Sequence, residues 1–468
     1  MPDNLYPLNL EDWPIEIDSS SQLFVDDYLI ASQHGLKRVV YSAKKHPDNP
    51  LIEPDKPWET RDAYGSRVEL YGAVMHDPAE GLYRIWYNAH EVCYAISADG
   101  ITWEKPELGL FDHDESSNTN ICYRAHKGYE YVDSVNIFHR PDEPDPEKRY
   151  AMFVFQYETE VRPGGMYLAH SPDGIHWTEG ERPVIPGFSS KPKDPKVNRE
   201  GVGDISQFIY DPKLGCYVGF LKILYHGKRV CALSTSEDLI HWTRPRMILL
   251  PDEDDPEDMD FYALSGFPYE SMWMGFLRVY RAEEHETIDI QLVSSRDGLH
   301  WDRVGNRESI IERGSKGLFD WGMLSVVPSP PLLIDNEIHI YYSGLAGLHT
   351  NRHSRACIGL ATLRRDRFVS LHAEKTMGEL ITRPLDFAGT NLHLNADADK
   401  GYIRVGVLDG NGGQIEGFKL DDCVSLTEDS LNHRVAWREN EGLRGLAGHT
   451  IRLKFQFSKA DLYSFNIS

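Results

Sequence analysis

Short apolar runs separated by polar turns fill the first three quarters of the chain. One example is "GAVMHDPAEGLYRIWYNA", in which a strand-like segment, a polar turn and an aromatic segment follow one another. The same order recurs in "NIFHRPDEPDPEKRYAMFVF", "QFIYDPKLGCYVGFLKI" and "GFPYESMWMGFLRVY". Runs of this length, bounded by Gly, Pro and Asp, are typical of β-strands. No long helical periodicity interrupts them, so the pattern predicts an all-β protein.

A seven-residue phrase follows each of these hairpins. "SADGITW" ends at Trp103, "SPDGIHW" at Trp177, "SEDLIHW" at Trp242 and "SRDGLHW" at Trp301. Three copies contain Asp-Gly, a strong signal for a two-residue hairpin turn because glycine tolerates positive φ. The tryptophan then opens the next strand. The phrase resembles the Asp-box of sialidases, and we interpret it as a structural turn and not as a site.

The hairpins and the phrase together predict repeated units of four antiparallel strands. A fifth copy, "PPLLIDNEIHIYYSGL" followed by "ACIGLATLRRDRFVSL", replaces the phrase with Arg-Asp-Arg-Phe. Five such units in radial repetition make a five-bladed β-propeller, which we predict over residues 1–375. A run of ordinary hairpins in a sandwich is the alternative. From about Met377, "YIRVGVLD" and "TIRLKFQF" alternate apolar and polar residues, which predicts a C-terminal antiparallel β-sandwich over 376–468.

Acidic residues stand near the start of the first strand of every unit. They are Glu69, Asp133, Asp204, Asp260 and Asp320. Because the first strands of a propeller line the axis in one direction, we expect their opening residues to converge at one mouth. Clustered carboxylates raise one another's pKa, which favours a functional site, although an Asp at a strand start can also simply cap a turn. Glu200, four residues before Asp204, is a rival acid.

Carboxylates that flank a scissile bond are what glycoside hydrolysis requires. Polar groups that close the second strands, and residues near the fifth unit, would hold a sugar. The predicted catalytic residues are Glu69, Asp133, Asp204 and Glu200, and the predicted substrate-binding residues are Asn88, Gln156, Lys222, Asp260, Arg278, Asp320, Trp321 and His349.

Charge and composition narrow the classes of molecule that the protein is expected to bind. The chain has 468 residues, with 49 basic and 73 acidic side chains and a net charge of -24. This balance argues against nucleic acid and anionic membranes, and favours a neutral or weakly charged carbohydrate. No apolar run is long enough to span a membrane. The acidic run at 251–260 and the pair His349 and His353 are interpreted as loops, so we predict no metal and no cofactor.

The cysteines and the start of the sequence bear on location. Six cysteines are scattered without a CxxC pair, mostly in apolar strands, which indicates reduced thiols. The first residues show no signal-peptide pattern. Both features favour a cytoplasmic protein, whereas a trimmed leader would make it periplasmic or secreted.

With these features the chain resembles the five-bladed glycoside hydrolases, chiefly the invertase and levanase group (family 32 type). It resembles more distantly the arabinofuranosidase and xylosidase group (family 43 type). "LFVDDYLI", "IGLATLRRDRFVSL" and "KADLYSF" carry the resemblance. It implies a hydrolase that removes a terminal, furanoside-like sugar, with Glu69 as nucleophile or base, Asp133 as transition-state stabiliser, and Glu200 or Asp204 as acid/base.

The chain departs from the catalytic motifs of that group. The Asn-Asp-Pro-Asn motif is missing, and Val132-Asp133-Ser134 and Glu200-Gly201 replace Arg-Asp-Pro and Glu-Cys. Two other functions therefore stay open. One is a glycoside phosphorylase of similar fold, which needs one carboxylate and a basic cluster for phosphate. The other is a non-catalytic carbohydrate-binding propeller.

Overall fold

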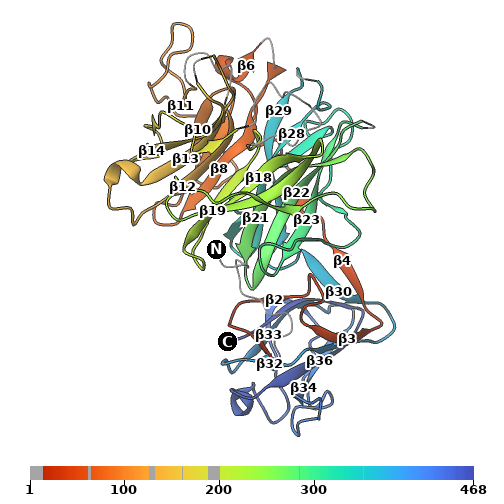
Figure 1. Ribbon diagram of the computed structural model, residues 1–468. Helices are drawn as coiled ribbons and strands as arrows, with labels where there is room; N and C mark the ends of the chain where they lie inside the picture. Colours follow the sequence, from red (N-terminus) through yellow and green to blue (C-terminus); the bar gives the residue numbers. More distant parts are fainter. Residues whose placement is uncertain are drawn as a thin grey trace.

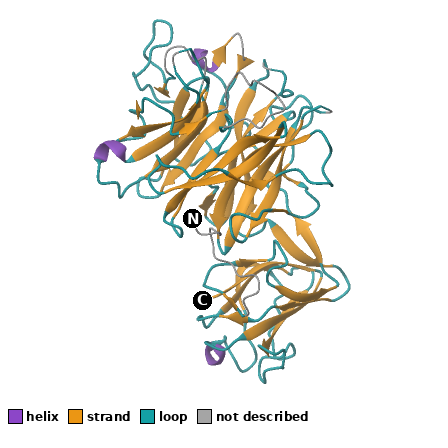
Figure 2. Cartoon of the chain, in the orientation of Figure 1, coloured by secondary structure: helices purple, strands orange, loops and turns teal. Residues whose placement is uncertain are grey.

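Strands make up nearly all the secondary structure of the chain (Figure 2). The computed structural model describes residues 14–61, 65–125, 132–160, 162–187, 201–283, 285–351 and 353–468. Helical structure within these ranges is limited to three 3-10 turns, η1 (Pro57–Glu59), η2 (Pro146–Lys148) and η3 (Arg444–Leu446). None of them is long or apolar enough to cross a bilayer. The all-β prediction is confirmed.

The first three repeats of the larger lobe each form a separate antiparallel sheet (Figure 1). The first contains β8 (Glu69–Asp77), β9 (Leu82–Asn88), β10 (Val92–Ser97) and β11 (Ile121–Tyr123). The second contains β12 (Asp133–His139), β13 (Tyr150–Gln156), β14 (Gly165–Ser171), β15 (Thr178–Glu179) and β16 (Ile185–Pro186). The third contains β17 (Gln207–Asp211), β18 (Cys216–Tyr225), β19 (Lys228–Ser236) and β20 (Arg246–Leu249).

The fourth and fifth repeats are joined by one parallel pair, Ile288 with Met323, into a sheet of ten strands. The fourth contains β21 (Met259–Tyr269), β22 (Met272–Arg281), β23 (Ile288–Ser295), β24 (Asp302–Arg303) and β25 (Ser309–Ile311). The fifth contains β26 (Met323–Val326), β27 (Leu332–Ile334), β28 (Glu337–Leu345) and β29 (Ala356–Arg364). Its outer strand is β5 (Lys44–Lys45), from near the start of the chain. A separate small hairpin is formed by β6 (Thr60–Arg61) and β7 (Gly65–Ser66).

The repeats pack on one another in a closed cycle. β12 contacts β8 and β17, β17 contacts β21, β22 and β23 contact β26, and β26 contacts β8 again. An apolar cluster lies between each repeat and the next. Pairs of residues from these clusters are Val74 with Leu360, Trp86 with Met152, Phe153 with Phe208, Phe220 with Trp273, and Phe276 with Ile340. Burial of these side chains supplies the hydrophobic free energy that holds the cycle together.

The smaller lobe consists of two sheets that share one apolar core. One sheet contains β1 (Ile15–Glu16), β3 (Ile30–His34), β31 (Gly378–Thr382), β32 (Leu385–Asp386), β34 (Tyr402–Asp409) and β36 (Ile451–Ser458). The other contains β2 (Gln22–Leu23), β4 (Lys37–Val40), β30 (Val369–Ala373), β33 (Leu392–Asp397), β35 (Asp429–Arg434) and β37 (Ala460–Ile467). Phe455 and Leu394 come from opposite sheets of this core.

The smaller lobe takes strands from both ends of the chain, which differs from the predicted limits. Residues 1–375 were expected in the first domain, but β1, β2, β3 and β30 pair with the C-terminal strands, and β4 pairs with β30 (Figure 1). Phe24 and Ile30 lie in the same core as those strands. The N-terminal strands are short and carry few apolar residues, so periodicity alone did not assign them to a sheet.

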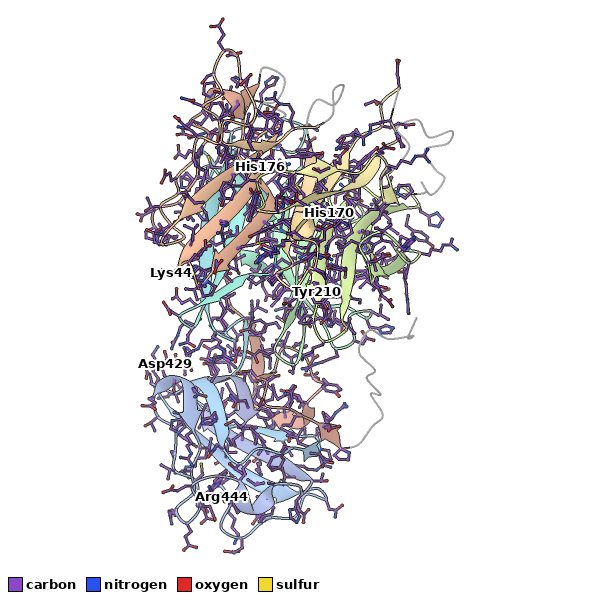
Figure 3. All side chains as sticks on the ribbon, turned by 90° about the vertical axis from the view of Figure 1, so that its left-hand side faces the viewer. Lys44, His170, His176, Tyr210, Asp429 and Arg444 are labelled. Carbon is purple, nitrogen blue, oxygen red and sulfur yellow. The ribbon has the colours of Figure 1, made fainter. Side chains whose placement is uncertain are left out.

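Polar contacts join the two lobes. Arg296 Nε lies 2.8 Å from Asp26 Oδ2, and the Tyr269 hydroxyl donates to Asp366 Oδ1 at 2.8 Å. Asp429, labelled at the top of the smaller lobe in Figure 3, accepts hydrogen bonds from Arg364, the last residue of β29, and from Arg367, which lies just after that strand. These ion pairs are partly buried, so removing one partner would leave a charge in a poorly solvated position.

The repeated phrase forms the same turn in all four copies. Asp99 Oδ1 accepts from the backbone N–H of Ile101 at 2.8 Å and of Thr102 at 2.7 Å. Asp173, Asp238 and Asp297 bind the equivalent two N–H groups. The backbone bond from Thr102, with that from Ile101, lowers the pKa of Asp99 to about 2. The phrase is therefore a structural Asx turn.

The prediction of a two-residue hairpin at this phrase was wrong. β14 ends at Ser171 and β15 begins at Thr178, so a longer loop joins them, with His176 exposed on its outside (Figure 3). Glycine suits this turn, because the backbone φ is positive there, +81° at Gly174 and +75° at Gly298. Leu239 adopts φ +70° at the equivalent position of the third copy, which shows that the aspartate, and not the glycine, defines the turn.

We expect Trp301→Ala to lower the free energy of unfolding by about 3–5 kcal/mol. Trp301 is buried between the third and fourth repeats, where its ring lies 5.7 Å from Phe220 and 6.3 Å from Trp273. Urea denaturation measures the loss. Ile240→Ala, an exposed position in another copy of the phrase, is the control and should change stability by less than about 0.5 kcal/mol. Equal losses in both variants would contradict this role.

Candidate active site

A cavity of about 670 Å³ lies at the opening ends of the first strands of the repeats. Glu69 is the first residue of β8, Asp133 is the first residue of β12, and Asp204 stands just before β17. The structure brings these acids together in one cavity wall, as the strand direction predicted. The other predicted residues in the wall are Asn88, Lys222, Arg278 and His349.

Irregular pairing aims two of the acids at the cavity. The register of β8 with β9 shifts between Glu69 and Ala73, and that of β12 with β13 shifts between Asp133 and Asn136. Ser134, at φ +52°, lies within the second shift. A bulge of this kind bends a strand and redirects the side chain before it. The acids are thus presented by local departures from regular β-structure.

The second and third repeats are tied together beside these acids. The Ser134 hydroxyl donates to the Ser206 carbonyl at 2.6 Å, and the Ser206 N–H donates to Ser134 Oγ at 2.8 Å. Both serines are buried. This pair of hydrogen bonds sets the spacing of Asp133 and Asp204, which stand within two residues of the two serines.

A tyrosine bridges Asp133 and Asp204. The Tyr157 hydroxyl oxygen lies 3.0 Å from Oδ2 of each aspartate, so the two Oδ2 atoms are no more than 6.0 Å apart. A phenol has one proton and can donate to only one carboxylate at a time. When it donates to Asp204, its contact with Asp133 requires that Asp133 be protonated and donate.

The pKa values of the two aspartates are displaced in opposite directions. Burial and the Asp204 carboxylate raise the pKa of Asp133 well above its usual range. Burial also acts to raise the pKa of Asp204, but the Lys222 ammonium and the Tyr157 hydroxyl outweigh it and lower that pKa. Asp133 is therefore the member of the pair that keeps its proton, and Asp204 is ionised.

Cations compensate the ionised carboxylates. Lys222, buried on β18, forms an ion pair with Asp204 Oδ1 and lies 4.4 Å from the centre of the Tyr262 ring. Burial lowers the pKa of Lys222, and Asp204 partly offsets this effect. Arg67 Nε lies 2.7 Å from Glu69 Oε1. Ion pairing at short range makes the burial of both carboxylates tolerable.

Fifteen residues of the wall were not foreseen, and five of them are cationic or carry a tyrosine hydroxyl. They are Arg67, Tyr71, Tyr157, Arg229 and Tyr262. Tyr157 directly follows Gln156, which was chosen instead because it closes an apolar strand. Adjacent strand residues point to opposite sides of a sheet. Continuing the alternation of β13 by one residue would therefore have placed Gln156 and Tyr157 on opposite sides. Tyr262 lies inside a long apolar strand, and no feature of the sequence around it indicated a place in the cavity wall.

Four predicted binding residues do not line the cavity, and each contacts another residue instead. Gln156 donates to the Tyr123 hydroxyl at 2.8 Å, and Arg229 holds Asp260 at 2.6 Å. Asp320 lies 2.5 Å from Lys45 Nζ and accepts from Tyr342 at 3.0 Å. The Trp321 ring lies 5.8 Å from Lys316 Nζ. Glu200 falls outside the described residues.

Neither metal ligands nor disulfides are found in the part of the chain that the structure describes. No three His, Cys, Asp or Glu side chains there are grouped as a metal ion would require. All six cysteines are free thiols, and five of them are buried. The chemistry available in the cavity is that of its carboxylates, cations, hydroxyls and two histidines, His90 and His349.

Neither a protein-family model nor a curated protein matches the chain. Among solved structures it is similar to an N-acetylgalactosamine deacetylase from F. plautii in complex with blood group B trisaccharide, at 15% identity and a TM-score of 0.46, over 72% of this chain and 97% of that one. It is also similar to a glycosyl hydrolase from Bacteroides ovatus, at 16% identity and a TM-score of 0.45, over 69% and 94%. A third is a thermostable family-43 glycoside hydrolase, at 13% identity and a TM-score of 0.44, over 67% and 95%. These three do not include an invertase or levanase, so the resemblance to that group stays a prediction.

We expect His349→Gln to remove part of the loss of stability at acid pH. Burial, with Arg229 and Lys222 nearby, lowers the pKa of His349 to about 4. Between about pH 6.5 and 4 the unfolded chain therefore binds more protons at this residue, and stability falls as the pH falls. Glutamine can keep the hydrogen bond to the Tyr262 hydroxyl, which lies 3.1 Å from His349 Nε2.

Urea denaturation at pH 7 and at pH 4.5 measures this change. The variant should lose less stability than the wild type over that interval. His353→Gln, at an exposed histidine of the same loop, should behave as the wild type. If the His349 and His353 variants lost stability equally, the neutral, buried state of His349 would be contradicted.

Proposed function

We propose that this chain is a glycoside hydrolase that removes a terminal, furanoside-like sugar from an oligo- or polysaccharide. In this proposal the five repeats are the blades of a β-propeller and the smaller lobe is a β-sandwich. The closed cycle of contacts between successive repeats supports the propeller. The acids at one end of that cycle support hydrolysis at its mouth.

The observation that carries the proposal is the pair Asp133 and Asp204, joined through Tyr157. General acid catalysis needs a carboxyl group that is still protonated at working pH, and the raised pKa of Asp133 meets that need. Asp133 would give its proton to the glycosidic oxygen as the bond to the anomeric carbon breaks. This assignment differs from the resemblance, which made Asp204 or Glu200 the proton donor.

Asp204 is a positioning residue in this proposal. Its Oδ1 pairs with Lys222 and its Oδ2 accepts from Tyr157, so both oxygens are engaged. It also lies closer to Asp133 than the roughly 6.5–9.5 Å that would seat a water molecule between an inverting acid and base. Its ionised state holds Tyr157 and keeps the pKa of Asp133 high.

Glu69 is then the group that acts at the anomeric carbon. Its Oε1 is paired with Arg67 Nε in the same wall. It would either attack that carbon or take a proton from the water that does, while Asp133 protonates the leaving oxygen. Asn88, whose buried Oδ1 has no hydrogen-bond partner among the described residues, offers an acceptor for a sugar hydroxyl.

A glycoside phosphorylase is the second candidate. The cations in the cavity wall favour it, because a phosphate that replaces water as the nucleophile needs positive groups to hold it. Turnover that requires inorganic phosphate and yields a sugar phosphate would identify a phosphorylase. Turnover in phosphate-free buffer would identify a hydrolase, and sugar binding with no turnover would identify a binding protein.

We expect Asp133→Asn to lower turnover at least a hundredfold with unchanged folding, since the amide is nearly isosteric and cannot donate a catalytic proton. A panel of natural oligosaccharides and nitrophenyl glycosides measures the rates. Nitrophenyl substrates should recover much of the loss, because their leaving group does not need protonation. Full activity of the variant on the natural substrate would refute the assignment.

We expect Tyr157→Phe to move the alkaline limb of the kcat/KM profile to higher pH. Once Asp133 ionises, the Tyr157 hydroxyl can donate to its carboxylate and so lowers its pKa, and removal of the hydroxyl therefore raises the pKa of Asp133 further. An acid with a higher pKa stays protonated to higher pH, which extends activity in that direction. The pH profile of wild type and variant measures the shift. A limb that stays in place or moves to lower pH would show that Asp133 is not the proton donor.

A further inference from the structure

Four cationic side chains described by the structure line the cavity, and they are not equally compensated. Three have a carboxylate partner, in the pairs Arg67 with Glu69, Lys222 with Asp204, and Arg229 with Asp260. The fourth, Arg278, has no carboxylate partner among the described residues. The cavity of this acidic protein therefore carries one positive charge that the described part of the fold does not balance.

Arg278 is almost completely buried, with 2% of its surface exposed. Its Nη2 donates to the Val326 carbonyl at 2.5 Å, which fixes one edge of the guanidinium. Nε and Nη1 are buried and reach no acceptor among the described residues. The ring of Tyr71 lies 5.9 Å from the guanidinium carbon. An unpaired buried cation with two unused donors is costly for folding unless a ligand uses it.

A second residue with an unused hydrogen-bond donor comes next in sequence to Val326, whose carbonyl accepts from Arg278. Ser325 precedes Val326 on β26 and lines the same cavity. Its hydroxyl is buried and has no hydrogen-bond partner within the described ranges. Arg278 comes from the fourth repeat and Ser325 from the fifth, so neighbouring repeats contribute a guanidinium and a hydroxyl to the same cavity wall.

We propose that Arg278 and Ser325 form an oxyanion-binding subsite, which takes the carboxylate of an acidic sugar or an inorganic phosphate. The inference rests on the proposed function, because the oxyanion is either part of the glycoside or delivered with it. A neutral hydroxyl would satisfy one donor and leave the charge unbalanced. A carboxylate or phosphate satisfies the charge and presents two or more acceptor oxygens to the planar guanidinium.

An anionic ligand at Arg278 differs from the substrate that the composition predicted. The net charge of -24 favoured a neutral or weakly charged substrate. Charge at the surface of the whole chain sets the long-range field, but the cations of the cavity wall set the potential that a bound ligand meets. The local excess of positive charge at Arg278 is therefore the better guide to the ligand.

Isothermal titration calorimetry of the full chain with phosphate, D-glucuronate and D-glucose tests the proposal. We expect phosphate or glucuronate, or both, to bind. Glucose, the neutral match for glucuronate, should bind at least tenfold more weakly than the anion that binds. Binding of glucuronate alone would indicate that the oxyanion is part of the sugar substrate. Binding of phosphate alone would indicate that the oxyanion is a co-substrate. If neither anion binds, the proposal is overturned.

Three variants locate the binding. Arg278→Met should weaken the anion at least tenfold, the equivalent of losing one charge-assisted hydrogen bond. Ser325→Ala removes only a hydroxyl, leaves folding intact, and should weaken binding about threefold to tenfold. Arg303→Met makes the same change at a buried arginine paired with Asp255 outside the cavity, and should leave the affinity unchanged. Anion affinity that is unaffected by both Arg278→Met and Ser325→Ala would overturn the proposal.

The failure of this inference and of the proposed hydrolysis can be told apart. Calorimetry needs no turnover, so a chain without glycosidase activity can still bind the anion. Asp133→Asn, expected to be inactive, should retain the anion affinity of the wild type. Conversely, if the chain hydrolyses neutral glycosides and binds neither anion, the proposed hydrolase function stands and the proposed oxyanion subsite is refuted.

Discussion

Buried carboxylates at the cavity are tolerable only because cations from neighbouring strands compensate them. Asp204 is paired with Lys222 and Glu69 with Arg67, whereas Asp133 forms no ion pair within the described part of the chain and keeps its proton instead. An isolated ionised carboxylate in such a place would cost several kcal/mol. Ion pairing and protonation are the two ways to avoid that cost, and this wall uses both. The division between them gives the acids their different chemical roles.

The scaffold around the cavity keeps these partners in register. Apolar clusters between successive repeats fix the repeats against one another, and the Asx turns that follow the third strands hold the connecting loops. The hydrogen bonds between Ser134 and Ser206 act at the inner ends, next to the acids. A small movement of one repeat would separate Tyr157 from one of its two aspartates. Rigid packing is therefore part of how the pKa values are set.

The start of the chain reinforces both lobes. β5 completes the sheet of the fifth repeat, and Lys45 within it lies 2.5 Å from Asp320, one of the acids predicted for the site. The strands before it complete the two sheets of the smaller lobe. An acid at the start of a fifth inner strand thus serves closure of the ring, while acids at equivalent places in the first three repeats face the cavity. Equivalent sequence positions need not have equivalent roles.

The sequence by itself determined the all-β class, the repeats and the convergence of Glu69, Asp133 and Asp204, because strand period and strand direction are local properties that recur along the chain. Partner choice is not local, and only the tertiary structure decided it. Tyr157 and Lys222 come from different repeats, and both contact Asp204, which belongs to the repeat of Lys222. Asp260 and Asp320 resemble the other acids in sequence but are occupied by Arg229 and Lys45. The N-terminal strands were missed for the same physical reason, since the pairing of short polar segments depends on which distant edge is free to receive them.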